Sequence, residues 1–161
     1  MGSEMCIRDR NWDEFREACT YFHIPGENMV WADKYGDIGW QAVGIAPIRS
    51  TFNGLVPVNG DGNFDWDGYL PIIQKPNLFN PEIGYISTAN QNVTPDTYKY
   101  WDAIGFDWAD PYRGDRINKF LEDKERFNME EMLELQVDYF SIPADEIPVS
   151  YTHLRAHETS L

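Results

Sequence analysis

The acidic stretch 59–68, with the sequence NGDGNFDWDG, is the first place where residue types could support chemistry. Its carboxylate and amide oxygens are the ligands that Ca²⁺ prefers. Asn63, Asp65 and Asp67 match the first, third and fifth ligand positions of an EF-hand calcium loop. The last position of that loop would be Gln74, which cannot supply the bidentate carboxylate. We therefore favour a solvated turn with packed aromatic side chains over a calcium site.

A cluster of opposite charges is the second candidate, made of Asp107, Asp110, Asp115, Arg113 and Arg116. Arg113 is expected in the first turn of a helix, where a cation is unfavourable against the helix dipole. Some other interaction must therefore offset the unfavourable placement of this cation. It either pairs with the neighbouring Asp side chains or serves in a site, and spacing alone leaves both interpretations open.

The histidines and cysteines predict no metal centre. His153 and His157 have the i, i+4 spacing of a zinc-binding pair, but the third ligand and the catalytic Glu are missing. His23 stands alone before a Pro-Gly turn and is read as a loop residue. Cys6 and Cys19 lack metal-like spacing. No phosphate-binding glycine loop and no G-x-S-x-G elbow is present.

The elements that must position such residues begin with a helix. Asn11 can cap it, its apolar side includes Trp12 and Phe15, and Pro25-Gly26 should end it. The β-rich runs 28–33 and 38–44 flank a Gly-containing turn and predict a hairpin.

The middle of the chain is predicted to be a long ordered excursion over 46–82, followed by a short strand over 83–89. A helix is predicted over 112–125. A last helix opens at Asn128, where Glu131 completes a capping-box pattern, and should stop at Pro143. This order of elements indicates an α+β fold.

Composition excludes several classes of protein. Of 161 residues, 42% are hydrophobic and 15% aromatic, which is typical of a folded domain and not of a disordered segment. The net charge of −14 argues against a nucleic-acid partner and against an anionic membrane surface. No apolar run approaches the roughly 20 residues of a membrane span, and the N-terminus has no signal-peptide pattern.

The two ends differ in character from the middle. Residues 1–10 and 148–161 have little periodicity, and both are similar to translated sequencing-adapter DNA. We predict that they are non-native flanks around a genuine segment, 11–147. Segments of this kind are set aside in reasoning about the fold.

Read together, the central motifs resemble the penicillin acylase family of N-terminal nucleophile hydrolases. The motifs occur in the family's order and at its spacing over about 11–147. They are NMVWADKYGDIGWQAVG (28–44), PIRS (47–50), GLVPVNGDGNFDWDGYLP (54–71), NPEIGYISTAN (80–90), WADPYRGDRI (108–117) and MEEMLELQVDYFSIPA (129–144).

The resemblance implies a partial αββα sandwich and an enzyme that hydrolyses a linear amide. Family members are made as precursors that cleave themselves into α and β chains. The Ser that begins the β chain is both nucleophile and, through its own α-amine, base. This chain resembles an internal piece of the β chain, so the nucleophile is expected to lie outside it. Ser3 follows Gly2 but lacks the family's context, and we do not interpret it as the nucleophile.

Site residues follow from the resemblance by position. The Asn after the G-Y-I motif falls on Asn90, whose side-chain amide donates to the oxyanion in the family. The Arg of the W-x-x-x-x-R stretch falls on Arg113, which in the family lies beside the nucleophile. Asp102 corresponds to a calcium ligand in some members. Many relatives have a second Asn where this chain has Gln91.

The implied protein is a periplasmic or secreted acylase, with a role in making or breaking down antibiotics or signalling amides. It needs no cofactor for catalysis and carries a structural calcium ion when complete. Its partners are a small amide substrate, the α chain and the rest of the β chain. The isolated chain is expected to be inactive and poorly soluble. The alternative is an acidic carbohydrate- or calcium-binding module that uses Trp31, Trp40, Trp66 and Tyr69.

Overall fold

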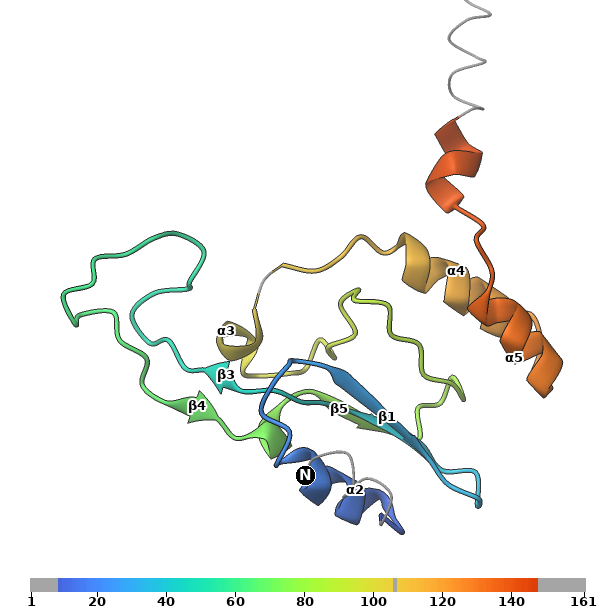
Figure 1. Ribbon diagram of the computed structural model, residues 1–161, viewed down its shortest axis with the longest axis horizontal. Coiled ribbons are helices and arrows are strands. Elements are labelled where there is room, and N and C mark those ends of the chain that lie inside the picture. Colours follow the sequence, from blue (N-terminus) through green and yellow to red (C-terminus); the bar gives the residue numbers. More distant parts are fainter. Residues whose placement is uncertain (1–8, 106, 148–161) are drawn as a thin grey trace, which may run out of the picture. The chain divides into compact units, whose positions relative to one another are not determined.

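The computed structural model describes residues 9–105 and 107–147 (Figure 1). The chain divides into two compact units. The first contains residues up to Ile86 together with Val93–Asp107, and the second contains Ser87–Asn92 and the residues from Trp108 onward. Helices and strands occur together, in agreement with the predicted α+β class.

The first unit begins with helix α2, Trp12–Cys19. Asn11 caps it as predicted, because its side-chain oxygen accepts a hydrogen bond from the backbone N–H of Glu14 at 2.9 Å. The helix buries Phe15, Ala18 and Cys19 along one face. It ends several residues before Pro25-Gly26, so the predicted end was too late.

The predicted hairpin is confirmed as strands β1, Asn28–Ala32, and β2, Ile38–Ala42, which pair antiparallel. Strand β5, Asn77–Phe79, pairs antiparallel with the other edge of β2. β5 lies within the predicted excursion, and its pairing was not predicted. The sheet order is therefore β1-β2-β5, and Figure 1 shows these strands running together beside α2.

The core of this unit lies between α2 and the sheet. The indole of Trp12 lies 5.5 Å from the ring of Phe15, 5.9 Å from Trp31 and 5.3 Å from Phe79, measured between ring centroids. A Cβ at Gly39 would come within 2.5 Å of the Trp12 ring. Glycine at this point of β2 is therefore what lets the indole lie flat across the strand.

Two buried polar side chains of this unit, those of Gln41 and Lys75, have hydrogen-bond partners. Gln41 is 0% exposed; its Oε1 accepts from Arg16 Nε at 3.0 Å and its Nε2 donates to the carbonyl of Ile72 at 3.0 Å. Buried Lys75 donates through Nζ to the carbonyls of Val43 and Gly44 at 2.6 and 2.9 Å. Burial lowers the pKa of Lys75. These bonds tie the end of β2 to the segment that leads into β5.

The excursion is ordered but has little regular structure. Strands β3, Ala46–Pro47, and β4, Tyr69–Leu70, pair antiparallel, and the 3₁₀ turn η1, Ile72–Gln74, leads toward β5. The short helix α3, Trp101–Ile104, was not predicted.

The second unit contains helix α4, Tyr112–Leu121, and helix α5, Met129–Gln136. The capping box at α5 is confirmed: Asn128 Oδ1 accepts from Glu131 N at 3.0 Å, and Glu131 Oε2 accepts from Asn128 N at 2.8 Å. The rings of Phe120 and Phe127 stack at 5.2 Å between the helices.

Three predictions for the later part of the chain were wrong: one strand and the ends of two helices. Residues 83–89 form no strand, since no other segment pairs with them among the described residues. α4 ends at Leu121 and not at 125, and α5 ends at Gln136, well before Pro143. Pro143 instead lies at the start of a helical segment over 142–147, where the missing N–H of proline costs nothing.

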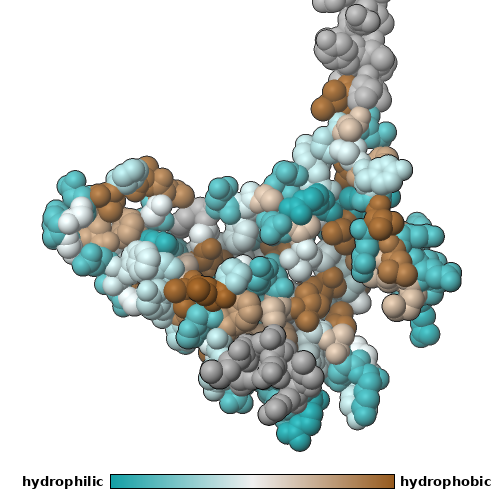
Figure 2. Space-filling view, in the orientation of Figure 1, coloured by the Kyte–Doolittle hydropathy of each residue, from teal (hydrophilic) through white to brown (hydrophobic). Residues whose placement is uncertain are grey.

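Many large apolar side chains reach the surface. Tyr139 is 97% exposed, Met129 77%, Ile24 75% and Val137 74%. Figure 2 shows hydrophobic groups scattered among hydrophilic ones on the visible face. Within residues 9–105 and 107–147, no helix is long and apolar enough to cross a membrane. The predicted flanks, residues 1–10 and 148–161, lie almost entirely outside the described residues.

Candidate active site

The segment 87–92 lies along α4 and is held there by side chains. The hydroxyl of Ser87 is hydrogen-bonded to Asn118 Oδ1. The side chain of Gln91 packs on Gly114, where a Cβ would come within 2.7 Å of Gln91 Cδ. Gly114 and Asn118 are four residues apart and therefore share one face of α4. The contacts on this face place Asn90, which directly precedes Gln91, beside the beginning of the helix.

Asn90 has an unusual backbone and a defined partner. Its φ angle is +67°, in the left-handed region that Asn tolerates better than most residues. Its carbonyl accepts from the backbone N–H of Ala109 at 3.0 Å. Its side-chain Oδ1 accepts from Arg113 Nη2 at 2.9 Å. Two of the residues predicted for the site, Asn90 and Arg113, are therefore brought into direct contact.

The hydrogen bond to Arg113 fixes the direction of the Asn90 amide. A guanidinium has only donors, so it is the carboxamide oxygen of Asn90 that must face Arg113. The Nδ2 donor then points away from Arg113. A preoriented N–H donor of this kind can stabilise negative charge that develops on a nearby oxygen.

The same contact bears on the two interpretations of Arg113. Arg113 bonds to the Asn90 amide and not to one of the neighbouring Asp residues. Arg116, by contrast, forms an ion pair with Asp138 at 2.6 Å. Arg116 therefore pairs with a carboxylate, whereas Arg113 bonds to a neutral amide whose N–H groups remain available as donors.

Space for a small molecule exists on the Arg113 side of α4. A hollow of roughly 520 Å³ is lined by Arg113 together with Tyr112, Tyr139, Phe140 and Ser141. Two carboxylates, those of Asp110 and Asp138, also line it, and Tyr139 is 97% exposed, so the hollow is open and mixed in charge.

Asp102, the predicted calcium ligand, lies in the first turn of α3 and is exposed. It belongs to the first unit, whereas Asn90 and Arg113 belong to the second. Among the described residues, no group of three or more His, Cys, Asp or Glu side chains is arranged to hold a metal ion. Asp102 supplies one carboxylate, which is too few for calcium, and its role as a ligand stays a prediction.

The acidic stretch 59–68 behaves as the solvated turn that we favoured. Asp67 accepts hydrogen bonds from the backbone N–H of Ser50 at 3.1 Å and from its hydroxyl. These bonds lower the pKa of Asp67. Asp67 therefore holds Ser50 within the loop.

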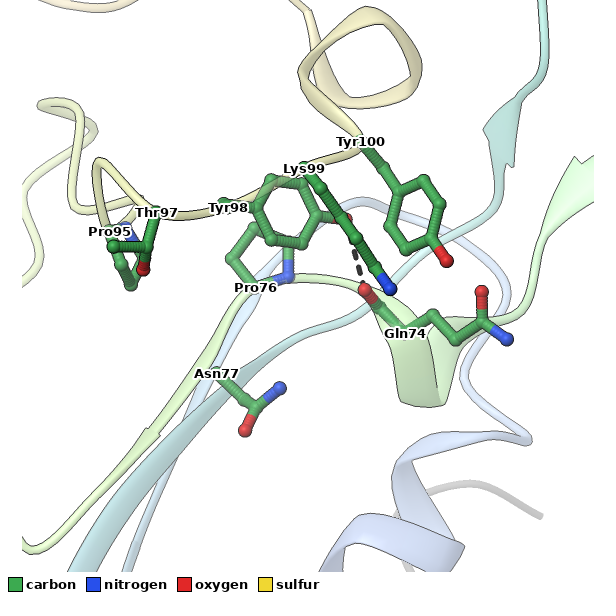
Figure 3. Close-up of a pocket in the computed structure, with 8 residues that line it drawn as sticks. All are labelled: Gln74, Pro76, Asn77, Pro95, Thr97, Tyr98, Lys99 and Tyr100. Carbon is green, nitrogen blue, oxygen red and sulfur yellow. Dashed lines mark hydrogen bonds between the residues drawn. The ribbon is translucent and has the colours of Figure 1, made fainter.

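A second hollow, of roughly 490 Å³, lies in the first unit between η1–β5 and the segment 95–100 (Figure 3). The hydroxyl of Tyr98 donates to the carbonyl of Gln74 at 3.0 Å and joins the two sides. Burial, and secondarily the nearby Tyr100, raise the pKa of Tyr98 to about 12. A phenol with this pKa stays protonated at neutral pH and is no base, so we assign the hollow no chemistry.

The alternative binding surface of Trp31, Trp40, Trp66 and Tyr69 was wrong as a single surface. Trp40 is 3% exposed and belongs to the core, and Trp31 packs on Trp12. Trp66 and Tyr69 are 54% and 51% exposed and meet edge to face at 6.0 Å. Of the four, this last pair is the most exposed.

Sequence reasoning missed the residues that support Asn90, namely Ser87, Asn118 and Gly114, and it named Gln91 only as a departure. Gly114 could have been noticed from the sequence, because it lies within the predicted helix, and glycine inside a helix is unfavourable and usually has a packing reason.

Comparison with known proteins shows which family the chain belongs to. The family model described as penicillin amidase matches residues 6–158. The chain is 32% identical over 126 residues to penicillin G acylase of Escherichia coli, covering 78% of this chain and 15% of that protein. It is 36% identical over 111 residues to the acyl-homoserine lactone acylase QuiP of Pseudomonas fluorescens, covering 68% of this chain and 13% of that protein.

A solved structure, the thermostable penicillin G acylase from Alcaligenes faecalis, matches with a TM-score of 0.63 at 28% identity, over 80% of this chain and 23% of that chain. The chain thus spans only a small part of the relatives that it matches. The match nevertheless runs over nearly the whole of this sequence and includes both Asn90 and Arg113. The chain belongs to the penicillin amidase family.

Proposed function

We propose that this chain supplies the oxyanion-stabilising part of an amidohydrolase that splits an acyl group from an amine. The observation that carries the proposal is the hydrogen bond from Arg113 Nη2 to Asn90 Oδ1 at 2.9 Å. It orients a neutral N–H donor beside the beginning of α4. Membership of the penicillin amidase family supports hydrolysis of an amide as the reaction.

The roles follow from the chemistry of acyl transfer. Attack of a hydroxyl on the amide carbon turns the carbonyl oxygen into an oxyanion, which needs donors already in place. Asn90 Nδ2 would supply one such donor. Arg113 would hold the amide in its orientation, and its positive charge would favour negative charge nearby. The nucleophile would be a Ser at the start of a mature β chain.

The test uses a chimeric acylase, in which residues 9–147 replace the matching segment of the Escherichia coli penicillin G acylase. Asn90→Ala should lower kcat by about 10²–10³, the usual cost of losing one oxyanion donor. Asn90→Asp should lower kcat as far, because a carboxylate can still accept from Arg113 but cannot donate. Full activity in Asn90→Asp would refute the proposed role of the amide.

The substrate is an amide with an acyl group on one side, and the relatives' names suggest penicillins or acyl-homoserine lactones. Hydrolysis of phenylacetyl and fatty-acyl anilides by the chimera, compared with its parent enzyme, would show whether these residues shift the preference. An unchanged preference would mean that the acyl group is selected elsewhere in the enzyme.

Several properties of the complete enzyme belong to the same proposal. The enzyme would be a self-cleaving precursor with an αββα sandwich, exported to the periplasm or secreted, and it would bind a structural calcium ion through Asp102 and other ligands. The 161-residue chain alone would not hydrolyse amides. Turnover of an anilide by this chain that Asn90→Ala abolishes and Ser3→Ala retains would contradict this.

The second candidate function rests on the exposed pair Trp66 and Tyr69, which could bind a carbohydrate by stacking. Titration with sugars or calcium, followed by Trp fluorescence, separates the two ideas. A saturable change that Trp66→Ala removes would favour a binding module.

A further inference from the structure

The contact between Gln91 and Gly114 is built more tightly than a loop packing on a helix requires. Gly114 is buried in α4, and a Cβ added to it would come within 2.7 Å of both Cδ and Nε2 of Gln91. We propose that Gln91 and Gly114 form a positioning lock, which holds Asn90 in its left-handed conformation and its amide against Arg113. The inference rests on the proposed function of Asn90.

The first argument is the backbone of Asn90. A residue with φ of +67° is held away from its preferred conformations, so its surroundings must hold it there. Hydrogen bonds hold the two residues that flank Asn90 and also its own carbonyl. Gln91 Oε1 accepts from Ala89 N at 2.6 Å, and Asn90 O accepts from Ala109 N at 3.0 Å.

The second argument is that the Gln91 side chain cannot easily move aside. Its Oε1 is held by Ala89 N, and its Nε2 lies 3.4 Å from the carbonyl of Ser87. The amide group thus bridges the turn that presents Asn90. A methyl group on residue 114 would therefore press on the amide group that makes this bridge, and the amide could move only by giving up these contacts.

The third argument is the sequence position of the glycine. Gly114 follows Arg113 directly, so one short piece of α4 carries both the guanidinium that binds the Asn90 amide and the gap that receives Gln91. A shift of the 87–92 segment would therefore break the lock and the Asn90–Arg113 bond together. Misplacement of a catalytic donor by about 1 Å can cost about 10²-fold in rate.

The experiment is a double-mutant cycle on kcat in the chimeric acylase. Gly114→Ala should lower kcat by about 10-fold or more and leave KM nearly unchanged, because the donor is displaced while the substrate pocket remains. Gln91→Ala should also lower kcat, since the bridge is lost. In the Gln91→Ala background, Gly114→Ala should cost little more, because its clash no longer exists.

Lys119→Ala, on an exposed position of the same helix, is the matched control and should leave kcat unchanged. Should Gly114→Ala fail to accumulate as folded enzyme, Gln91→Ala carries the test, since it removes the contact without adding atoms. Independent, additive effects of the two substitutions on kcat would overturn the lock. A loss of kcat that merely follows a loss of thermal stability would overturn it too. Loss of kcat in Asn90→Ala without loss in Gly114→Ala would overturn the lock but leave the proposed function standing.

Discussion

The most informative perturbation removes the guanidinium that orients the Asn90 amide. In Arg113→Ala the bond of 2.9 Å to Asn90 Oδ1 is lost, and the amide can rotate so that its donor leaves the oxyanion. A hydrogen bond to a charged group is worth about 1.5–3 kcal/mol, and the lower value applies because both residues are exposed in this chain. Such a loss corresponds to about 10-fold in rate, since about 1.4 kcal/mol is a factor of ten.

Arg113→Ala should therefore lower kcat of the chimeric acylase about 10-fold, less than the 10²–10³ or so expected for Asn90→Ala. The assay is steady-state hydrolysis of a phenylacetyl anilide by the single and double variants. On the Asn90→Ala background, Arg113→Ala should cost less than about 3-fold, because Arg113 then has no amide to orient. A full additional loss would show that Arg113 acts on the substrate and not through Asn90, and would refute the reasoning.

Further predictions concern the 161-residue chain itself. Gln41→Leu should lower the free energy of unfolding by about 2 kcal/mol, since the fully buried amide loses its hydrogen bonds with Arg16 Nε and with the Ile72 carbonyl; urea denaturation checks this, and an unchanged midpoint would contradict it. Tyr98, with its pKa raised from 10.0 to about 12, contributes stability that is full below pH 10 and is lost as pH rises toward 12. Urea midpoints of wild type and Tyr98→Phe should therefore converge over this range. Asn128→Ala should cost about 1 kcal/mol through the lost α5 cap, visible by circular dichroism, whereas an exposed change near the other end of the helix such as Glu134→Ala should not.

Local patterns in the sequence predicted the elements that depend on local forces. The caps at Asn11 and Asn128 are both present, because a side-chain acceptor beside free backbone N–H groups needs only its own turn. The β1–β2 hairpin is present for the same reason, since its turn is short. The resemblance of the motifs also predicted the family, which the comparisons confirm.

Pairings that join distant segments could not be predicted in this way. β5 pairs with β2 across more than thirty residues of irregular chain, and nothing near Asn77 signals that partner. The expected strand at 83–89 failed for the converse reason. A strand is stable only beside another strand, and none of the described segments pairs with it.

The candidate site was predicted in part. Position in the family's motifs pointed to Asn90 and Arg113, and the structure brings them to 2.9 Å. The supporting contacts of Gln91 and Gly114 depend on how the 87–92 segment lies on α4, which no local pattern reveals. Trp40 was assigned to a surface although it is buried, because the alternation of a short strand does not say which of its faces is covered.

The central claim is that the Asn90 amide donates to the oxyanion, and a crystal structure of the chimeric acylase with a tetrahedral adduct on its nucleophile tests it most directly. The account predicts Asn90 Nδ2 at about 2.7–3.1 Å from the oxyanion oxygen, with Oδ1 still bonded to Arg113. An adduct oxygen held only by other donors, with Asn90 Nδ2 beyond hydrogen-bonding distance, would contradict it.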